Sequence, residues 1–185
     1  MGLVNDFNNT LSLWLNSHGF SNIDIVEGEE FCYYYTSHTI QWGFFSKDST
    51  DNNFRQFIAE YGSNYNDIEP FILSLIHELG HHMTLPNFSA DELEEEKVRK
   101  EIRALENSSI DINYWYWELP TELAANVWTI NFINNNIELV EELQDLCKSH
   151  IEKILSDNNI LQQLFDWQYD MMNGEDYREL IIEED

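Results

Sequence analysis

Residues 69–83 read EPFILSLIHELGHHM. Apolar residues recur here every three or four positions, a spacing that predicts a helix with one buried side, formed by Ile72, Leu75, Ile76, Leu79 and Met83. Residues four apart lie on the same side of a helix, about 6 Å apart along its axis. His77 and His81 are therefore placed to bind one metal ion. We expect this helix to begin near residue 67, with Pro70 in its first turn, and to end near residues 84–86.

Glu78 lies between the two histidines in sequence but not on their side of the helix. A catalytic zinc ion takes three protein ligands and keeps a fourth position for water, whose pKa it lowers to about 7. Because Glu78 is rotated by about 100° from His77, it is better placed to meet that water than to bind the ion. It could accept the water's proton and later pass it to a leaving amine. The sequence therefore predicts a general base beside a metal.

A third metal ligand has to come from another element, and our prediction is Glu122. The chain from Pro120 onward predicts a helix whose buried side consists of Leu123, Val127 and Ile130. Glu122 lies outside that side and is therefore available to the metal. Asn126, one turn further along, is predicted to accept the free imidazole N–H of His77 or His81, a contact that fixes the tautomer of a metal-binding histidine.

The motif His77-Glu-Leu-Gly-His81, followed by Glu122-Leu-Ala-Ala-Asn126, resembles the gluzincin branch of the zincin metallopeptidases, whose pattern is HExxH and then ExxxD on a second helix. It looks most like the small zincins of bacteriophages and mobile elements, including those that act on repressor proteins. The resemblance covers about residues 68–133. It implies that His77, His81 and Glu122 bind one zinc ion and that Glu78 is the general base.

The same resemblance implies a fold and a reaction. The fold would be of the α+β class and zincin-like, with a small mixed or antiparallel N-terminal sheet packed on the HExxH helix and a mostly helical C-terminal half. The reaction would be zinc-dependent hydrolysis of a peptide bond, by an endopeptidase acting on a protein or peptide substrate. A substrate-binding edge strand is also implied before the metal helix, and residues 39–44 fit it by position.

One position departs from the gluzincin pattern, because Asn126 stands where the pattern has an acid. An amide supplies no negative charge to make a histidine more basic, so the metal would be held less tightly. Alternatively Glu118, four residues before Glu122, would take part as the third ligand. Three further side chains are hypotheses for transition-state donors, namely His150, Tyr114 and Tyr116. For His150 the alternative is a hydrogen-bonded core histidine.

The remaining elements are predicted from periodicity and composition. β-Branched and aromatic residues at 23–26 and 31–45 predict strands. Helices are predicted at 6–17, at 53–61, at 137–155 and at 159–172. A capping-box pattern at Ser89 and Glu92 predicts the start of another helix. That helix is expected to be mostly solvated, with acid-before-base pairs at Glu95/Arg99 and Glu96/Lys100.

Length and charge restrict the classes of function. A chain of 185 residues is expected to form a single domain over residues 1–185. The net charge of −26 argues against nucleic acid as a partner, because phosphate binding needs clustered Lys and Arg. The charge favours basic partners, or alternatively only keeps the surface solvated. It motivates a second hypothesis, that of an acidic protein-interaction or nucleic-acid-mimic protein that keeps a zincin scaffold without peptidase activity.

The cysteines and the N-terminal residues predict the cellular compartment in which the protein is found. Cys32 and Cys147 are far apart and form no metal or redox pattern, which indicates buried free thiols in a reducing compartment. The first residues lack a basic segment followed by an apolar run, and no apolar run approaches the length of a membrane span. We therefore expect a cytoplasmic protein that does not act at a membrane. The sequence does not predict the oligomeric state.

Overall fold

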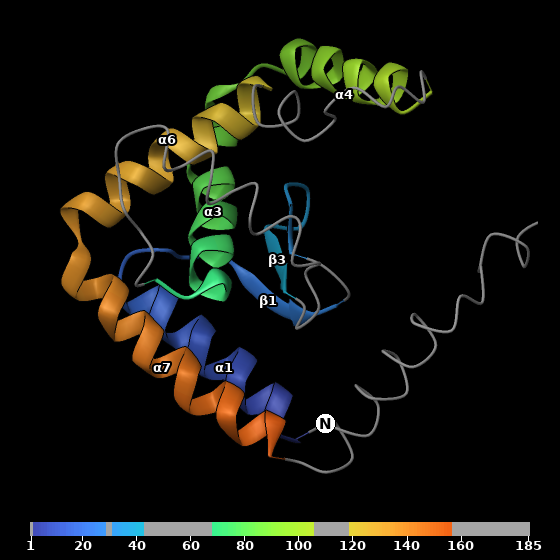
Figure 1. The fold of residues 1–185 in the computed structure, drawn as a ribbon. Coiled ribbons are helices and arrows are strands. Elements are labelled where there is room, and N and C mark those ends of the chain that lie inside the picture. The colour runs from blue at the N-terminus through green and yellow to red at the C-terminus, as the bar shows by residue number, and fades with distance from the viewer. Residues whose placement is uncertain (1, 29–30, 43–67, 106–118, 157–185) are drawn as a thin grey trace, which may run out of the picture. The chain divides into compact units, whose positions relative to one another are not determined.

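The computed structural model describes residues 2–28, 31–42, 68–105 and 119–156 (Figure 1). The predicted helices at 53–61 and 159–172 lie outside these residues, as do Glu118, Tyr114 and Tyr116. Contacts divide the chain into two compact units, Met1–Cys147 and Lys148–Asp185. The fold below is that of the first unit, except that the last helix continues into the second unit, and the expected single domain stays a prediction.

The strands form one small mixed sheet. They pair in the order β1-β3-β2, with β1 at Asp24–Glu27, β2 at Cys32–Tyr34 and β3 at Thr39–Trp42. Ile40 of β3 lies opposite Ile25 in the parallel pair and opposite Tyr33 in the antiparallel pair. Because β3 is hydrogen-bonded on both sides, the expectation that residues 39–44 provide an edge strand for substrate is wrong for residues 39–42. A central strand has no free backbone groups to offer a peptide.

The HExxH helix, α3, spans Pro70–Thr84 and runs into a short 3-10 turn, η1, at Leu85–Asn87. It begins at Pro70, three residues after the predicted start near residue 67, and its end agrees with the prediction. Five of its apolar side chains are fully buried: Ile72, Leu73, Leu75, Ile76 and Leu79. Met83, which was predicted for the same side, is 43% exposed. Figure 1 shows α3 between the sheet and helix α6 (Pro120–Asn135), and it contacts both.

Aromatic side chains join the first helix to the sheet and to α3. Helix α1 spans Gly2–Ser17 and buries Val4, Phe7, Leu11, Trp14 and Leu15. The ring of Phe7 lies 5.0 Å from that of Trp42 on β3 and 6.0 Å from that of Phe71 on α3. Burial of such rings is a large part of core stability. The sheet is thereby fixed against the helix that carries both histidines, as the predicted α+β fold requires.

Helix α4 spans Ala90–Leu105 and begins with the predicted capping box. The backbone N–H of Ser89 donates to Glu92 Oε2 at 2.8 Å, and the backbone N–H of Glu92 donates to Ser89 Oγ at 3.3 Å. The backbone N–H and the hydroxyl of Ser89 both donate to the Glu92 carboxylate and lower its pKa, because they stabilise its charged form. Both predicted ion pairs are present, between Glu95 and Arg99 and between Glu96 and Lys100.

Helix α7 spans Ile137–Leu155, as predicted, and completes the mostly helical C-terminal half. The indole N–H of Trp14 donates to Glu142 Oε1 at 2.8 Å and thus joins α1 to α7. Neither cysteine forms a disulfide; Cys147 is buried in α7 and Cys32 is half-buried. Burial raises the pKa of the Cys147 thiol to about 12. Among the described residues, no helix is both long enough and apolar enough to cross a membrane.

The buried side of α6 differs from the predicted one. Leu123 and Val127, predicted to be buried, are 36% and 43% exposed, and Ile130 is half-buried. The buried side chains are Thr121, Glu122, Ala125, Asn126, Thr129 and Ile133. The reason is that this largely polar side packs against α3, where Glu122 meets His77 and His81 and the hydroxyl of Thr129 lies near Ile76 O. Contact with α3 therefore overrides the apolar pattern of α6.

Candidate metal centre

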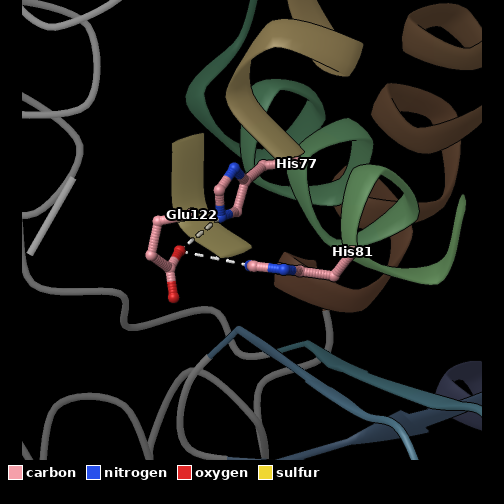
Figure 2. Close-up of side chains that lie close together, drawn as sticks. All are labelled: His77, His81 and Glu122. Carbon is pink, nitrogen blue, oxygen red and sulfur yellow. Dashed lines mark hydrogen bonds and ion pairs between the residues drawn. The ribbon is translucent and has the colours of Figure 1, made fainter. Parts of the chain in front are cut away.

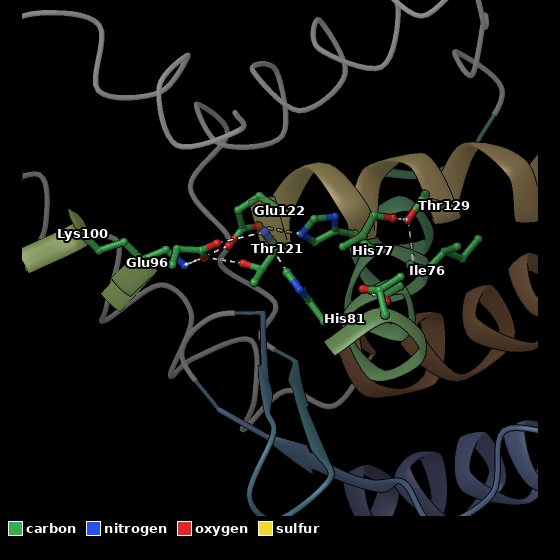
Figure 3. Close-up of polar contacts among 11 residues, drawn as sticks. Ile76, His77, His81, Glu96, Lys100, Thr121, Glu122 and Thr129 are labelled. Atoms are coloured by element: carbon green, nitrogen blue, oxygen red, sulfur yellow. Dashed lines mark hydrogen bonds and ion pairs between the residues drawn. The ribbon is translucent and has the colours of Figure 1, made fainter. Parts of the chain in front are cut away.

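Helices α3 and α6 approach closely because small residues face each other where they cross. Gly80 has no side chain, and a Cβ placed there would lie 2.7 Å from the carbonyl oxygen of Ala125. The hydroxyl of Thr129 on α6 donates to Ala125 O of the same helix at 2.8 Å. It also lies 3.4 Å from Ile76 O on α3 (Figure 3). The close approach brings the first turn of α6 to the HExxH turn of α3.

Three predicted ligands meet at this crossing (Figure 2). Glu122 Oε2 lies 3.3 Å from His77 Nε2 and 3.2 Å from His81 Nε2. All three ligand atoms lie within 4.8 Å of one another. Zinc bonds of about 2.0–2.1 Å at tetrahedral angles separate neighbouring ligand atoms by about 3.3 Å. Two of the three separations therefore match the edge of a zinc tetrahedron, and the donor set fits one ion.

The three ligand groups are shielded from water. His77, His81 and Glu122 are 5%, 9% and 3% exposed. Burial by itself raises the pKa of the Glu122 carboxyl, but the contacts with the imidazoles of His77 and His81 outweigh burial and hold that pKa well below its usual range. The carboxylate is therefore charged at neutral pH, which is the form that binds a cation.

The second oxygen of Glu122 has its own partner on α4. Lys100 Nζ lies 3.3 Å from Glu122 Oε1 and 3.1 Å from Glu96 Oε1 (Figure 3). Glu96, which is 6% exposed, also accepts the backbone N–H of Thr121 at 2.9 Å and the hydroxyl of the same residue. Sequence reasoning treated Glu96 and Lys100 as a surface pair, and their spacing does not distinguish them from the exposed pair Glu95 and Arg99.

Glu78 is buried at 7% exposure on the same helix turn as the histidines. It is not one of the three clustered ligand groups. Its role as general base stays a prediction.

Two further predicted site residues, Asn126 and His150, are among the described residues and are not members of this ligand group. Asn126 is completely buried, and neither its amide nitrogen nor its amide oxygen has a hydrogen-bond partner in the described structure. The predicted hydrogen bond from a histidine N–H to that oxygen is therefore not formed in this structure, and the support of a metal ligand by Asn126 stays a prediction. His150 is half-buried near the end of α7, in the second unit, with its Nδ1 3.3 Å from Ser149 Oγ. Its role as a transition-state donor is likewise untested.

A second group of ring side chains lies beside the end of α3 and had no functional interpretation from the sequence. The Tyr33 hydroxyl lies 2.8 Å from His38 Nδ1 and 2.9 Å from His82 Nδ1. Burial, with a smaller effect of Tyr35, raises the pKa of Tyr33; burial, with a smaller effect of His38, lowers the pKa of His82. His38 has φ +52° in the turn between β2 and β3. The contact between Tyr33 and His82 joins that hairpin to α3 at the residue that follows His81.

Comparison of the chain with protein-family models, with curated proteins and with solved structures found no match. The class of the protein therefore follows from its fold and its clustered side chains alone. The chain is of the α+β class, and two of its helices bring together a buried His-His-Glu group that could hold one metal ion.

Proposed function

We propose that the chain is a zinc-dependent peptide-bond hydrolase, an endopeptidase, in which His77, His81 and Glu122 hold the ion. The observation that supports this most is the convergence of Glu122 Oε2 with the two Nε2 atoms, at 3.3 and 3.2 Å, in a buried site. Two histidines and one glutamate are a known ligand set of catalytic zinc, which keeps a further position open for water or substrate. The mixed nitrogen and oxygen donors suit zinc better than the all-oxygen sites of calcium or magnesium.

Zinc bound there would polarise a scissile carbonyl group and make water more acidic. The chain's own residues supply the remaining steps. Glu78 is one position from His77 and largely excluded from solvent. In the proposal its carboxylate accepts a proton as water attacks the carbonyl carbon, and then donates that proton to the amine that leaves. Glu122 stays charged and offsets one of the two positive charges of the ion.

The test combines metal content with hydrolysis. Purified wild-type protein should carry about one zinc per chain and cleave quenched fluorescent peptides from a mixed-sequence library. Glu78→Gln should keep the zinc and lose hydrolysis, whereas His77→Ala should lose both. Glu95→Gln, which alters an exposed carboxylate on α4, is the matched control and should change neither. Wild-type protein that takes up no zinc after loading would end the proposal.

A second candidate function is that of an acidic interaction protein without peptidase activity. The observation that favours it is the net charge of −26, together with the solvent-exposed acids of α4: Asp91, Glu92, Glu94, Glu95 and Glu101. Such a surface attracts basic partners. Binding to a basic protein that persists in Glu78→Gln and after chelation of metal would favour this function. Cleavage of the bound protein by the wild type alone would favour the peptidase.

A further inference from the structure

We propose that Lys100 and Glu96 are positioning residues that fix Glu122 as a monodentate metal ligand. This inference rests on the metal site of the proposed function, but it does not depend on peptidase activity. It starts from the observation that the two carboxylate oxygens of Glu122 have different partners. Oε2 faces both histidines, and Oε1 faces Lys100 Nζ at 3.3 Å.

Lys100 restricts how the Glu122 carboxylate can turn. A carboxylate is planar, so holding Oε1 on one side determines where Oε2 points. Glu122 is 3% exposed, and an oxygen at that depth is costly to leave without a hydrogen bond or charge partner. Without Lys100, the carboxylate would turn so that Oε1 also approaches the ion and Oε2 leaves its position between the two imidazoles, which would replace one well-placed bond with two poorer ones. Lys100 therefore favours a single oxygen ligand and an open fourth position.

Glu96 holds Lys100 in place and also holds the turn that carries Glu122. It is the only buried side chain among positions 90–102, the part of α4 whose side chains are described. Its carboxylate accepts both the backbone N–H and the hydroxyl of Thr121, in the first turn of α6. Backbone N–H groups in the first turn of a helix lack partners within the helix, and a carboxylate there is favoured by the helix dipole.

The charge of Lys100 also repels a metal ion, so its net effect on affinity has to be weighed. Glu96 Oε1 lies 3.1 Å from Lys100 Nζ and offsets most of its charge. The ammonium side chain is also 37% exposed, so solvent screens it. The Glu96–Lys100 pair therefore adds little net field at the metal, and the contact with Glu122 Oε1 is the larger effect. Loss of that contact should weaken metal binding.

The test measures the metal site directly in the full-length chain. Lys100→Met removes the ammonium but keeps most of the side-chain volume, and Lys100→Arg keeps a donor. Arg99→Met is the matched control, because Arg99 is the neighbouring cation of α4 and pairs with the exposed Glu95. Zinc affinity is measured by competition with a chromophoric chelator. Cobalt(II) then replaces zinc, since its visible absorption weakens when a four-coordinate ion gains a fifth ligand.

We expect Lys100→Met to lower zinc affinity by about 10- to 100-fold, the usual cost of losing a residue that supports a metal ligand. Its cobalt absorption should also weaken. Lys100→Arg should recover most of both, and Arg99→Met should match the wild type. A Lys100→Met protein with wild-type affinity and an unchanged cobalt spectrum would overturn the inference. Absence of metal binding in the wild type is a different result, since it refutes the proposed function and the inference together.

Glu96 is tested through its coupling to Lys100. Glu96→Gln keeps an oxygen that can accept the backbone N–H of Thr121 but loses the charge that holds the ammonium. We expect it to change the cobalt spectrum in the same direction as Lys100→Met. In the double variant the two effects should not add, because both act on the orientation of Glu122. Fully additive effects would show that Glu96 acts separately, and would remove it from the proposal.

Discussion

Gly80 on α3 faces the backbone of Ala125 on α6 so closely that a Cβ at residue 80 would lie 2.7 Å from the Ala125 carbonyl oxygen. The obstacle is backbone, which cannot turn aside as a flexible side chain can. Gly80→Ala should therefore push the helices apart, lower the free energy of unfolding by about 1–3 kcal/mol and weaken zinc binding. Urea denaturation and chelator competition measure the two effects.

The control for this substitution is Gly2→Ala. Gly2 is also helical, at the start of α1, but a Cβ there would meet nothing within 4 Å. Since alanine favours a helix more than glycine does, Gly2→Ala should leave the free energy of unfolding unchanged or slightly increased. If Gly80→Ala were as stable as wild type and bound zinc equally well, the close approach would not be what forms the site.

The buried thiol of Cys147 predicts a loss of stability at high pH. Burial raises its pKa from 9.0 to about 12. Between these values the unfolded chain releases the thiol proton and the folded chain keeps it, so unfolding becomes easier as the pH rises. This one group should remove up to about 1.4 kcal/mol per pH unit over that range. Below pH 9 it should have no effect.

Tyrosines and lysines also titrate above pH 9, so the prediction for Cys147 concerns a difference between two proteins. The free energy of unfolding is measured for wild type and for Cys147→Ala at several values between pH 7 and 11. The gap between them should stay constant up to about pH 9 and then narrow, because the variant lacks the titrating thiol. A gap that stays constant throughout would contradict the prediction.

Local patterns predicted much of the fold. The spacing of His77 and His81 placed both on one side of a helix, and the structure gives that helix the expected end. The capping box at Ser89 and the full span of α7 also followed from nearby residues alone. Each depends on interactions within about one helix turn, which is why sequence reasoning could find it.

The environment of Glu122 did not follow from local patterns. Glu122 was selected because it lay outside an apolar side formed by Leu123 and Val127, yet those two residues are exposed and Glu122 is buried. The position was therefore found for a reason that the structure contradicts. Contact between α3 and α6, which are distant in sequence, decides which side of α6 is buried. Glu96 and Lys100 were missed as part of the site for the same reason.

The Tyr33 hydroxyl joins the β2–β3 hairpin to α3 through His38 and His82. Tyr33→Phe removes that hydroxyl and leaves Nδ1 of the half-buried His82 without this hydrogen bond. The free energy of unfolding should therefore fall by about 1 kcal/mol. Tyr34→Phe is the matched control, since the hydroxyl of Tyr34 lies at the surface, 3.3 Å from Gln41 Oε1. Its effect should stay within about 0.5 kcal/mol. Equal effects in urea denaturation would show that the contact with α3 contributes nothing.

Asn126 is completely buried with an amide that has no hydrogen-bond partner in the described structure, one turn from Glu122. Asn126→Asp introduces an acid at this position, as in the gluzincin pattern that the sequence resembles. It should destabilise the zinc-free protein, because it buries a charge. With zinc bound, the carboxylate would accept an N–H from a metal-binding histidine, so zinc affinity should rise by about 10-fold or more.

The measurement for Asn126 is the melting temperature with and without zinc, together with zinc affinity from chelator competition. The rise in melting temperature on adding zinc should be larger for Asn126→Asp than for wild type, because a tighter ligand stabilises the folded state more. Asn126→Leu should raise the zinc-free melting temperature, since it replaces an unsatisfied polar group with an apolar one of similar size, and should not tighten zinc binding. If Asn126→Asp bound zinc no better than Asn126→Leu, Asn126 would not support a metal ligand.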